Sequence, residues 1–210
     1  MTPIVYSIKN IPYEDVVFGR LKRGLDHHYM GTYINKNNEQ SNLYVQTPRM
    51  YITSNVEDTT FLQFTSDKDD VHESISKMES YVLGYLKDNK ETLFANKGID
   101  DVFLEAGHTS SILKDNRIRF RMSNDTNIFN NAKEALDLTE LKKGHMVKSI
   151  VQMVGLWFTS NRWGITWKLN QIKLESERNV KKLHQYMFDD QDDEDDEDEN
   201  NDLLTPPPDV

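Results

Sequence analysis

The chain has 210 residues, enough for one domain with a hydrophobic core, and a formal net charge of −10. It contains no cysteine, which excludes disulfide bonds, thiolate metal sites and cysteine nucleophiles, and which suits a reducing compartment. The N-terminus does not resemble a signal peptide, and no apolar stretch approaches the roughly 20 residues that span a bilayer, so we expect a soluble intracellular protein.

Four segments in the first third of the chain have the β-branched and aromatic residues that are typical of strands. Gly19 predicts a bulge in the first segment, and Pro48 predicts a bend or an edge position in the third. A run of Asn, Lys, Glu and Gln between the second and third segments predicts a polar loop. The segments are residues 16–25, 27–34, 43–52 and 60–64, and the loop spans residues 35–42.

Residues 69–87 predict an amphipathic helix. Val71, Ile75 and Met78 follow the helical period and begin one apolar stripe, while charged residues lie mostly on the other side. Acidic residues near the start of the segment would interact favourably with the positive end of the helix dipole. We expect the apolar stripe to pack on the core.

Residues 117–122 alternate arginine with apolar residues, which predicts a strand with one apolar face. Three arginines on one strand face are unusual for a simple solvent surface, where Lys and Glu usually mix. This face is therefore a candidate for phosphate binding. Nearby, residues 101–111 leave helix and strand open, whereas residues 132–141 and 175–188 each predict a helix.

The stretch VQMVGLWFTSNRWGITWKLNQIKL, residues 151–174, predicts a β-hairpin and holds all three tryptophans of the chain. Two β-prone runs flank the polar turn at residues 159–162, and Gly164 predicts a bend. By the period of two, Trp163 and Trp167 share one face with Ile165 and Leu169, and Thr166, Lys168 and Asn170 share the other. Because alternating tryptophans cannot all face solvent, we expect at least one of them to lie in the core.

The net charge conceals a basic region in the body of the chain. Residues 189–210 carry twelve of the 35 acidic residues and no Lys or Arg, so 23 acidic residues remain against 25 basic ones. Residues 140–188 contain nine basic residues against three acidic ones, and the aromatic hairpin lies among them. Flat aromatic rings beside cations are what a single-stranded nucleic acid needs, since bases stack and phosphates attract positive charge.

The sequence offers little that indicates catalysis. Phosphate-loop, HExxH, GxSxG and EF-hand spacings are absent. The adjacent His27 and His28 would face opposite ways on a strand, which is poor geometry for one metal. Asp100, Asp101 and Glu105 form only a weak candidate for a metal-assisted nuclease site. We therefore expect no enzymatic activity, no cofactor and no metal.

A β-rich body with one amphipathic helix and a basic aromatic hairpin fits the five-stranded oligonucleotide-binding (OB) barrel, which commonly carries a helix between its third and fourth strands. The sequence GLWFTSNRWGITWKLNQIKL, together with LYVQTPRM at residues 43–50, resembles the single-stranded DNA-binding proteins of the nucleocytoplasmic large DNA viruses, over about residues 29–174. This resemblance implies an OB-like core that binds single strands without sequence preference. It further implies a role in replication, recombination or repair, in the host cytoplasm or nucleus.

We therefore predict a mainly β, OB-like domain with extra elements over residues 1–188, with its core at about 16–174. Binding of RNA and formation of a homo-oligomer stay open. Candidates for base stacking are Trp157, Phe158, Trp163 and Trp167, with Tyr44 and Tyr51 as weaker ones. Candidates for phosphate contacts are Arg49, Arg117, Arg119, Arg121, Arg162, Lys168 and Lys173.

Residues 189–210 predict a disordered acidic tail, because such dense charge cannot bury enough apolar surface to fold. As a tethered polyanion the tail would compete with DNA for a basic groove and, when displaced, recruit replication proteins. A merely solubilising tail is the simpler alternative. A second alternative is a histone-chaperone-like interaction protein whose tail is itself the binding site, and a third is a nuclease or other enzyme with an unrecognised site.

Overall fold

The computed structural model describes residues 3–25, 27–36, 39–56, 60–67, 69–94 and 99–177. The predicted acidic tail and most of the predicted helix at residues 175–188 lie outside these ranges. The first residues of that predicted helix are described, and they continue a long strand that ends at Glu177. Within the described chain, no helix is both long and apolar enough to cross a membrane.

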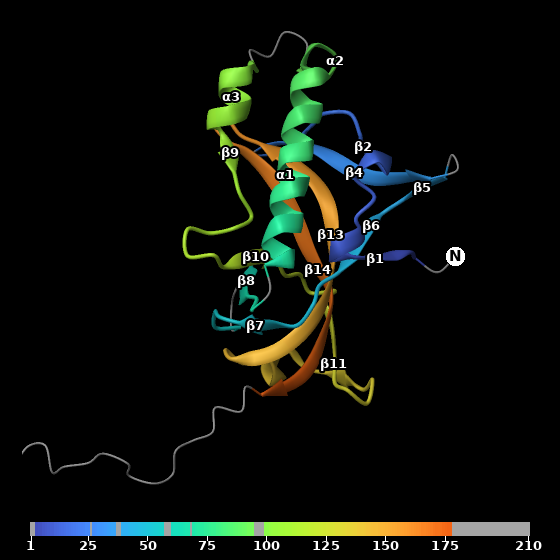
Figure 1. The fold of residues 1–210 in the computed structure, drawn as a ribbon, viewed down its shortest axis with the longest axis vertical. Coiled ribbons are helices and arrows are strands. Elements are labelled where there is room, and N and C mark those ends of the chain that lie inside the picture. The colour runs from blue at the N-terminus through green and yellow to red at the C-terminus, as the bar shows by residue number, and fades with distance from the viewer. Residues whose placement is uncertain are drawn as a thin grey trace, which may run out of the picture. The chain divides into compact units, whose positions relative to one another are not determined.

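Five strands of the described chain close into a barrel (Figure 1). Around the barrel the order is β7, β8, β10, β14, β13 and back to β7. Strands β10 and β14 run parallel, and the other neighbours run antiparallel. The predicted mainly β fold with an OB-like five-stranded barrel is therefore confirmed. The barrel strands are β7 (Met50–Ile52), β8 (Phe61–Thr65), β10 (Ile118–Arg121), β13 (His145–Phe158) and β14 (Trp163–Glu177).

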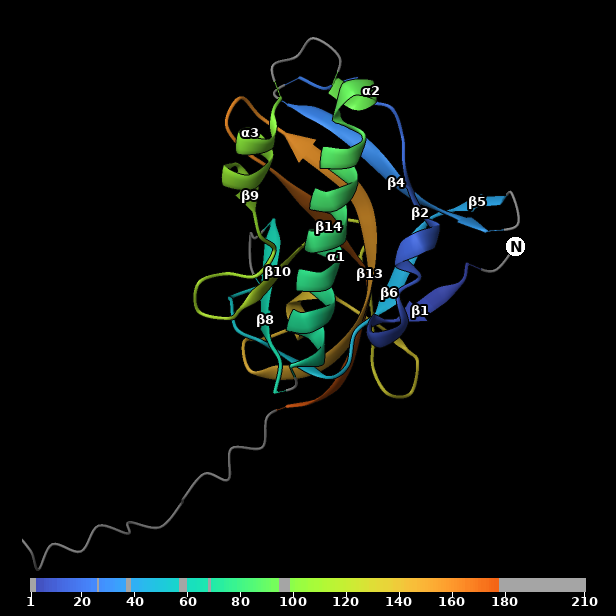
Figure 2. The same cartoon turned by 45° about the horizontal axis from the view of Figure 1, so that its top comes forward.

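The predicted amphipathic helix is present as α1 (Asp70–Asp88), and its apolar stripe is buried. Figures 1 and 2 show it running alongside β13 and β14. The helix follows β8, the second barrel strand, and not the third as in the common OB arrangement. The long connection from β8 to β10 contains all the α-helices of the described chain. That connection also contains α2 (Lys90–Phe94), α3 (Asp101–Ala106) and β9 (His108–Thr109), so the ambiguous segment at residues 101–111 is a helix followed by a short strand.

The N-terminal strands extend the sheet beyond the barrel. Strand β4 pairs with the end of β13 at Gly155, where a Cβ atom would lie 1.9 Å from the carbonyl oxygen of Met30, so glycine permits this close approach. The predicted strand at residues 16–25 is two short strands, and the predicted loop at 35–42 contains the end of one strand and the whole of another. The elements are β1 (Val5–Ser7), η1 (Ile8–Asn10), η2 (Tyr13–Asp15), β2 (Val16–Phe18), β3 (Lys22–Arg23), β4 (His28–Lys36), β5 (Glu39–Ser41) and β6 (Leu43–Gln46).

The helix predicted at residues 132–141 is wrong. In its place lie β12 (Ala135–Leu136), which pairs with β11 (Asn127–Phe129), and the 3-10 helix η3 (Leu138–Glu140). The turn between β11 and β12 places Lys133 at a φ of 67°, a left-handed conformation that interrupts a helix. The Asn130 side chain accepts a hydrogen bond from the backbone N–H of Glu134, which closes the turn.

The predicted hairpin at residues 151–174 is confirmed and forms the longest pairing of the sheet, between β13 and β14. Trp163 and Trp167 are buried together with Ile165 and Leu169, as the period of two predicts, while Thr166, Lys168 and Asn170 lie on the outer face and are partly exposed. The hairpin therefore contributes one face to the core and leaves the other partly exposed.

Candidate nucleic-acid interface

Trp157 lies on the outer face of β13. Its neighbours Leu156 and Phe158 both point into the core, and alternation along the strand directs the indole outward, where it is half-buried. The ring lies against Gly164 on β14, where a Cβ atom would come within 2.8 Å of Trp157 Cζ2. Gly164 is inside a continuous strand, so the bend predicted there is wrong. The glycine instead provides a flat backbone surface beneath the ring.

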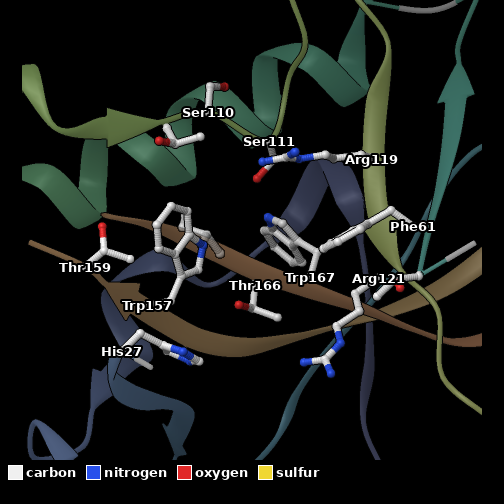
Figure 3. Close-up of a pocket in the computed structure, with 13 residues that line it drawn as sticks. His27, Phe61, Ser110, Ser111, Arg119, Arg121, Trp157, Thr159, Thr166 and Trp167 are labelled. Atoms are coloured by element: carbon white, nitrogen blue, oxygen red, sulfur yellow. The ribbon is translucent and has the colours of Figure 1, made fainter. Parts of the chain in front are cut away.

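Trp157 lines a pocket of about 350 Å³, which we call the tryptophan pocket (Figure 3). The pocket lies beside residues 165–167 of β14, between the residues of β14 that pair with β9 and the residue that pairs with β10. Trp163 and Gly164 pair with β9, and Lys168 pairs with Arg121 of β10. The pocket is lined by His27, Thr60, Phe61, Thr109, Ser110, Ser111, Arg119, Arg121, Trp157, Thr159, Ile165, Thr166 and Trp167.

The predicted arginine face divides at this pocket. Arg119 and Arg121 line it, and the guanidinium carbon of Arg119 lies 5.5 Å from the centre of the Phe61 ring, a cation–π contact. Arg117 instead forms an ion pair with Asp115, which raises the pKa of Arg117, and it does not line the pocket. Because the described residues that line the pocket include no Asp or Glu, its arginines meet no competing carboxylate there.

Helix α1 fixes one wall of the tryptophan pocket. Its Glu79 is buried, accepts a hydrogen bond of 2.8 Å from the Ser110 hydroxyl and another of 2.7 Å from the backbone N–H of Ser111. The carboxylate thus holds the chain that follows β9 at a fixed distance from the helix. Sequence reasoning missed both serines, since no local pattern connects them to a glutamate some thirty residues earlier.

A row of outward side chains continues from Trp157 onto β4 and β3. Trp157 is directly opposite Tyr29, and Tyr29 is directly opposite Lys22. Directly opposed residues share a face and have neighbouring side chains. Tyr29 is 42% exposed, so an aromatic ring and a cation extend the surface beside the pocket. The signal in the sequence is the cluster of basic and aromatic residues at 20–33, which by itself predicts only strands.

A family model matches residues 53–190, and its description is "Family of unknown function (DUF5871)". The match spans more than half of the chain. The chain belongs to the DUF5871 family. The matched region contains most of the tryptophan pocket, whereas His27, Tyr29 and Lys22 precede it. No curated protein matches the sequence.

Among solved structures, this DUF5871 member is similar to the single-stranded DNA-binding protein from bacteriophage Enc34. The TM-score is 0.42 at 12% sequence identity, over 85% of this chain and 99% of the phage chain. The same phage protein in complex with ssDNA gives a TM-score of 0.40 at 12% identity, over 76% and 96% of the two chains. We draw no functional conclusion from a likeness at this level.

Three of the predicted stacking residues, Phe158, Trp163 and Trp167, are core residues of this DUF5871 member. Trp163 is fully buried, and its Nε1–H donates a hydrogen bond of 2.7 Å to the carbonyl oxygen of Leu104. Phe158 is buried and stacks on Trp163 with ring centres 6.2 Å apart. Neither ring offers a face to a base, because the core already covers it. The expectation that at least one tryptophan is core is confirmed.

Lys173 and Arg49 lie at a second surface, away from the tryptophan pocket. Lys173 lines a pocket of about 450 Å³ with Lys133 and Lys148, which we call the lysine groove. Arg49 forms an ion pair with Glu175, whose carboxylate also lies 3.3 Å from Lys148 and is only 8% exposed. Burial alone would raise the pKa of Glu175, but the hydrogen bonds from Arg49 and Lys148 outweigh it, and the pKa is lowered.

The remaining predicted residues line neither the tryptophan pocket nor the lysine groove. Lys168 is beside Arg121 in register, and its ammonium lies 2.6 Å from Asp125, which holds the pKa of Asp125 at about 2. Arg162 is exposed in the turn of the hairpin. Tyr44 on β6 and Tyr51 on β7 are half-buried, and neither lines the tryptophan pocket.

Proposed function

We propose that this protein is a non-enzymatic, sequence-independent single-stranded DNA-binding protein, and that the strand binds across the tryptophan pocket. The observation that carries the proposal is the half-buried Trp157 beside Arg119 and Arg121, in a pocket without a carboxylate in its described lining. The accessible indole supplies a stacking surface for a base, and the two guanidinium groups supply charge for phosphates.

The position of the pocket on the barrel supports the proposal. OB barrels bind oligonucleotides on the face of their second and third strands and at the loops that follow the first and fourth. Here the second and third barrel strands are β8 and β10, which supply Phe61, Arg119 and Arg121. Thr60 precedes β8, and Thr159 begins the turn after β13, so both loops also reach the pocket.

The sequence supports a biological setting for this proposed function. The resemblance of the aromatic hairpin to the single-stranded DNA-binding proteins of large DNA viruses supports a role in viral replication, recombination or repair, in the host cytoplasm or nucleus. The acidic residues 189–210 support a tail that competes with DNA for the pocket and, once displaced, recruits replication proteins.

The proposal is tested by titrating the full chain with poly(dT) and with a duplex of equal length, while following tryptophan emission. Binding of the single strand should quench the emission, since Trp157 stacks on a base, and should be tighter than binding of the duplex, whose bases have no free faces. Equal affinity for the two would contradict the single-strand assignment.

A further inference from the structure

Trp167 differs from the other buried tryptophan in what its indole nitrogen contacts. The side chain of Trp167 is 3% exposed, and among the described residues its Nε1–H finds no hydrogen-bond acceptor. The Nε1–H of Trp163, equally buried, donates to the carbonyl oxygen of Leu104. Nearly all buried donors in folded proteins are paired, because an unpaired one loses its bonds to water without replacement. The free donor of Trp167 can therefore accept a partner from outside the described residues.

The unpaired donor is directed into the tryptophan pocket. Trp167 lines the pocket, and Figure 3 shows its indole nitrogen on the side of the ring that faces Trp157 and Ser111. The two rings come from opposite faces of the hairpin. The ring of Trp157 is half-buried, whereas Trp167 belongs to the buried core layer. A ligand that contacts both must reach below the surface of the sheet.

The size of the pocket limits what can enter. A volume of about 350 Å³ is near the lower end for small-molecule sites, which suits one flat heterocycle and not a length of backbone. The wall opposite Trp157 is held by the hydrogen bonds from Ser110 and Ser111 to Glu79, so its width is fixed in the free protein. The Ser110 hydroxyl already donates its hydrogen to Glu79, so toward a ligand the Ser110 oxygen can act only as an acceptor.

The chemistry of the lining selects a ligand with acceptors. The pocket combines the Trp167 donor with the guanidinium groups of Arg119 and Arg121, and no carboxylate is present in its described lining. An unpaired base has a π face for Trp157, an acceptor on its edge for Trp167 and an attached phosphate for the arginines. A free anion would satisfy the arginines but would leave the aromatic walls without a partner.

We propose that the tryptophan pocket receives one unpaired base of the bound strand, and that a carbonyl oxygen or ring nitrogen on its edge accepts the hydrogen bond of Trp167 Nε1–H. The inference rests on the proposed function and adds to it a specific contact with a base edge. Because every natural base carries such an acceptor, the contact keeps binding tolerant of sequence. It disfavours a base of the same shape that lacks a strong acceptor.

The test uses two oligonucleotides and the full chain labelled with nitrogen-15. One oligonucleotide is oligo(dT), and in the other the thymines are replaced by difluorotoluene, which keeps the shape but accepts hydrogen bonds poorly. Three tryptophans give three indole N–H signals, assigned by single Trp→Phe variants. Oligo(dT) should shift the Trp167 signal downfield and leave the Trp163 signal in place. The difluorotoluene strand should bind roughly 3- to 10-fold more weakly and leave the Trp167 signal unshifted.

Trp167→Phe keeps an aromatic ring and removes the donor, so it should bind the two oligonucleotides with equal affinity. Trp163→Phe is the matched control, since it removes a buried donor that is already paired and should retain the preference for oligo(dT). If Trp167→Phe fails to fold, the wild-type NMR comparison still decides. Tight binding of oligo(dT) with an unshifted Trp167 signal, or equal affinity of the wild-type protein for both strands, would overturn the inference alone. Failure of both strands to bind at low salt would overturn the proposed function as well.

Discussion

The tryptophan pocket and the lysine groove both border β14, yet they differ in how their cations are held. In the pocket, Arg119 lies against the ring of Phe61 and has no acidic neighbour in the described lining. In the groove, Lys148 shares the buried carboxylate of Glu175 with Arg49. A cation that is already paired within the protein gains less from a phosphate, because the new contact replaces an existing one. Local charge alone therefore does not identify a binding surface.

The two surfaces also differ in their aromatic residues. The pocket is lined by Trp157, with Tyr29 beside it in the sheet. The groove is lined by a single ring, Phe129, among the described residues. Stacking makes binding specific for unpaired strands, while cations alone bind any polyanion. We therefore expect the groove to contribute general attraction and the pocket to contribute the preference for single strands.

The largest difference should come from removing the ring at each surface. Trp157→Ala should weaken poly(dT) binding by about 5- to 150-fold, the equivalent of roughly 1–3 kcal/mol of lost stacking. Phe129→Ala in the lysine groove should change the affinity by less than about twofold. Fluorescence anisotropy with labelled poly(dT) at one salt concentration measures both. Equal losses in the two variants would show that the strand occupies both surfaces.

The arginines should produce the next largest effect. The double variant Arg119→Ala and Arg121→Ala should weaken binding about tenfold at low salt and reduce the log–log salt slope by about 1.4, since each phosphate contact contributes roughly 0.7 for single strands. The double variant Lys148→Ala and Lys173→Ala removes the same charge from the groove and should reduce the slope less. Arg117→Ala should have little effect, because Arg117 is paired with Asp115. A larger slope change for the lysine variant would assign the phosphates to the groove.

A smaller effect should follow from removing residues 189–210, which carry twelve acidic residues. If the tail competes with DNA, truncation should tighten poly(dT) binding by a few fold at low salt, and the gain should fade at high salt as screening increases. The gain should survive in the lysine double variant and disappear in the arginine double variant. The histone-chaperone alternative predicts no gain in any background, because the tail would then be the binding site for basic proteins.

The smallest effect should come from Glu175→Gln. The folded-state pKa of Glu175 is lowered from its ordinary value of 4.5, so its ionised form stabilises the fold above that pH and this contribution is lost as the pH falls. Wild type should therefore lose about 1 kcal/mol more than the variant between pH 7 and pH 3. Urea unfolding at the two pH values measures the difference. Poly(dT) affinity at pH 7 should stay nearly unchanged, and a large loss would contradict the separation of the two surfaces.

Residue spacing within a single segment predicts the elements that have a local period. The stripe of α1, the alternation of arginines along β10 and the two faces of the β13–β14 hairpin all follow from spacing within one segment, which burial reinforces. The helix predicted at residues 132–141 failed because a weak apolar pattern could not reveal the turn around Lys133. Local periodicity thus predicted the barrel strands and the main helix, but not the shorter connections.

Which of these residues form the pocket depends on contacts between segments that are distant in the sequence. The period of two separates the faces of a strand, but strand pairing decides that Trp157 neighbours Tyr29 and that Tyr29 neighbours Lys22. Strand pairing also leaves Ile165 to Trp167 between the residues of β14 that pair with β9 and the residue that pairs with β10. Ion pairing is equally non-local, since Arg49 contacts Glu175 from 126 residues away. Register and charge pairing depend on segments that are distant in sequence. For this reason a list of aromatic and basic residues contained the site but could not separate Trp157 from Trp163, or Arg119 from Arg49.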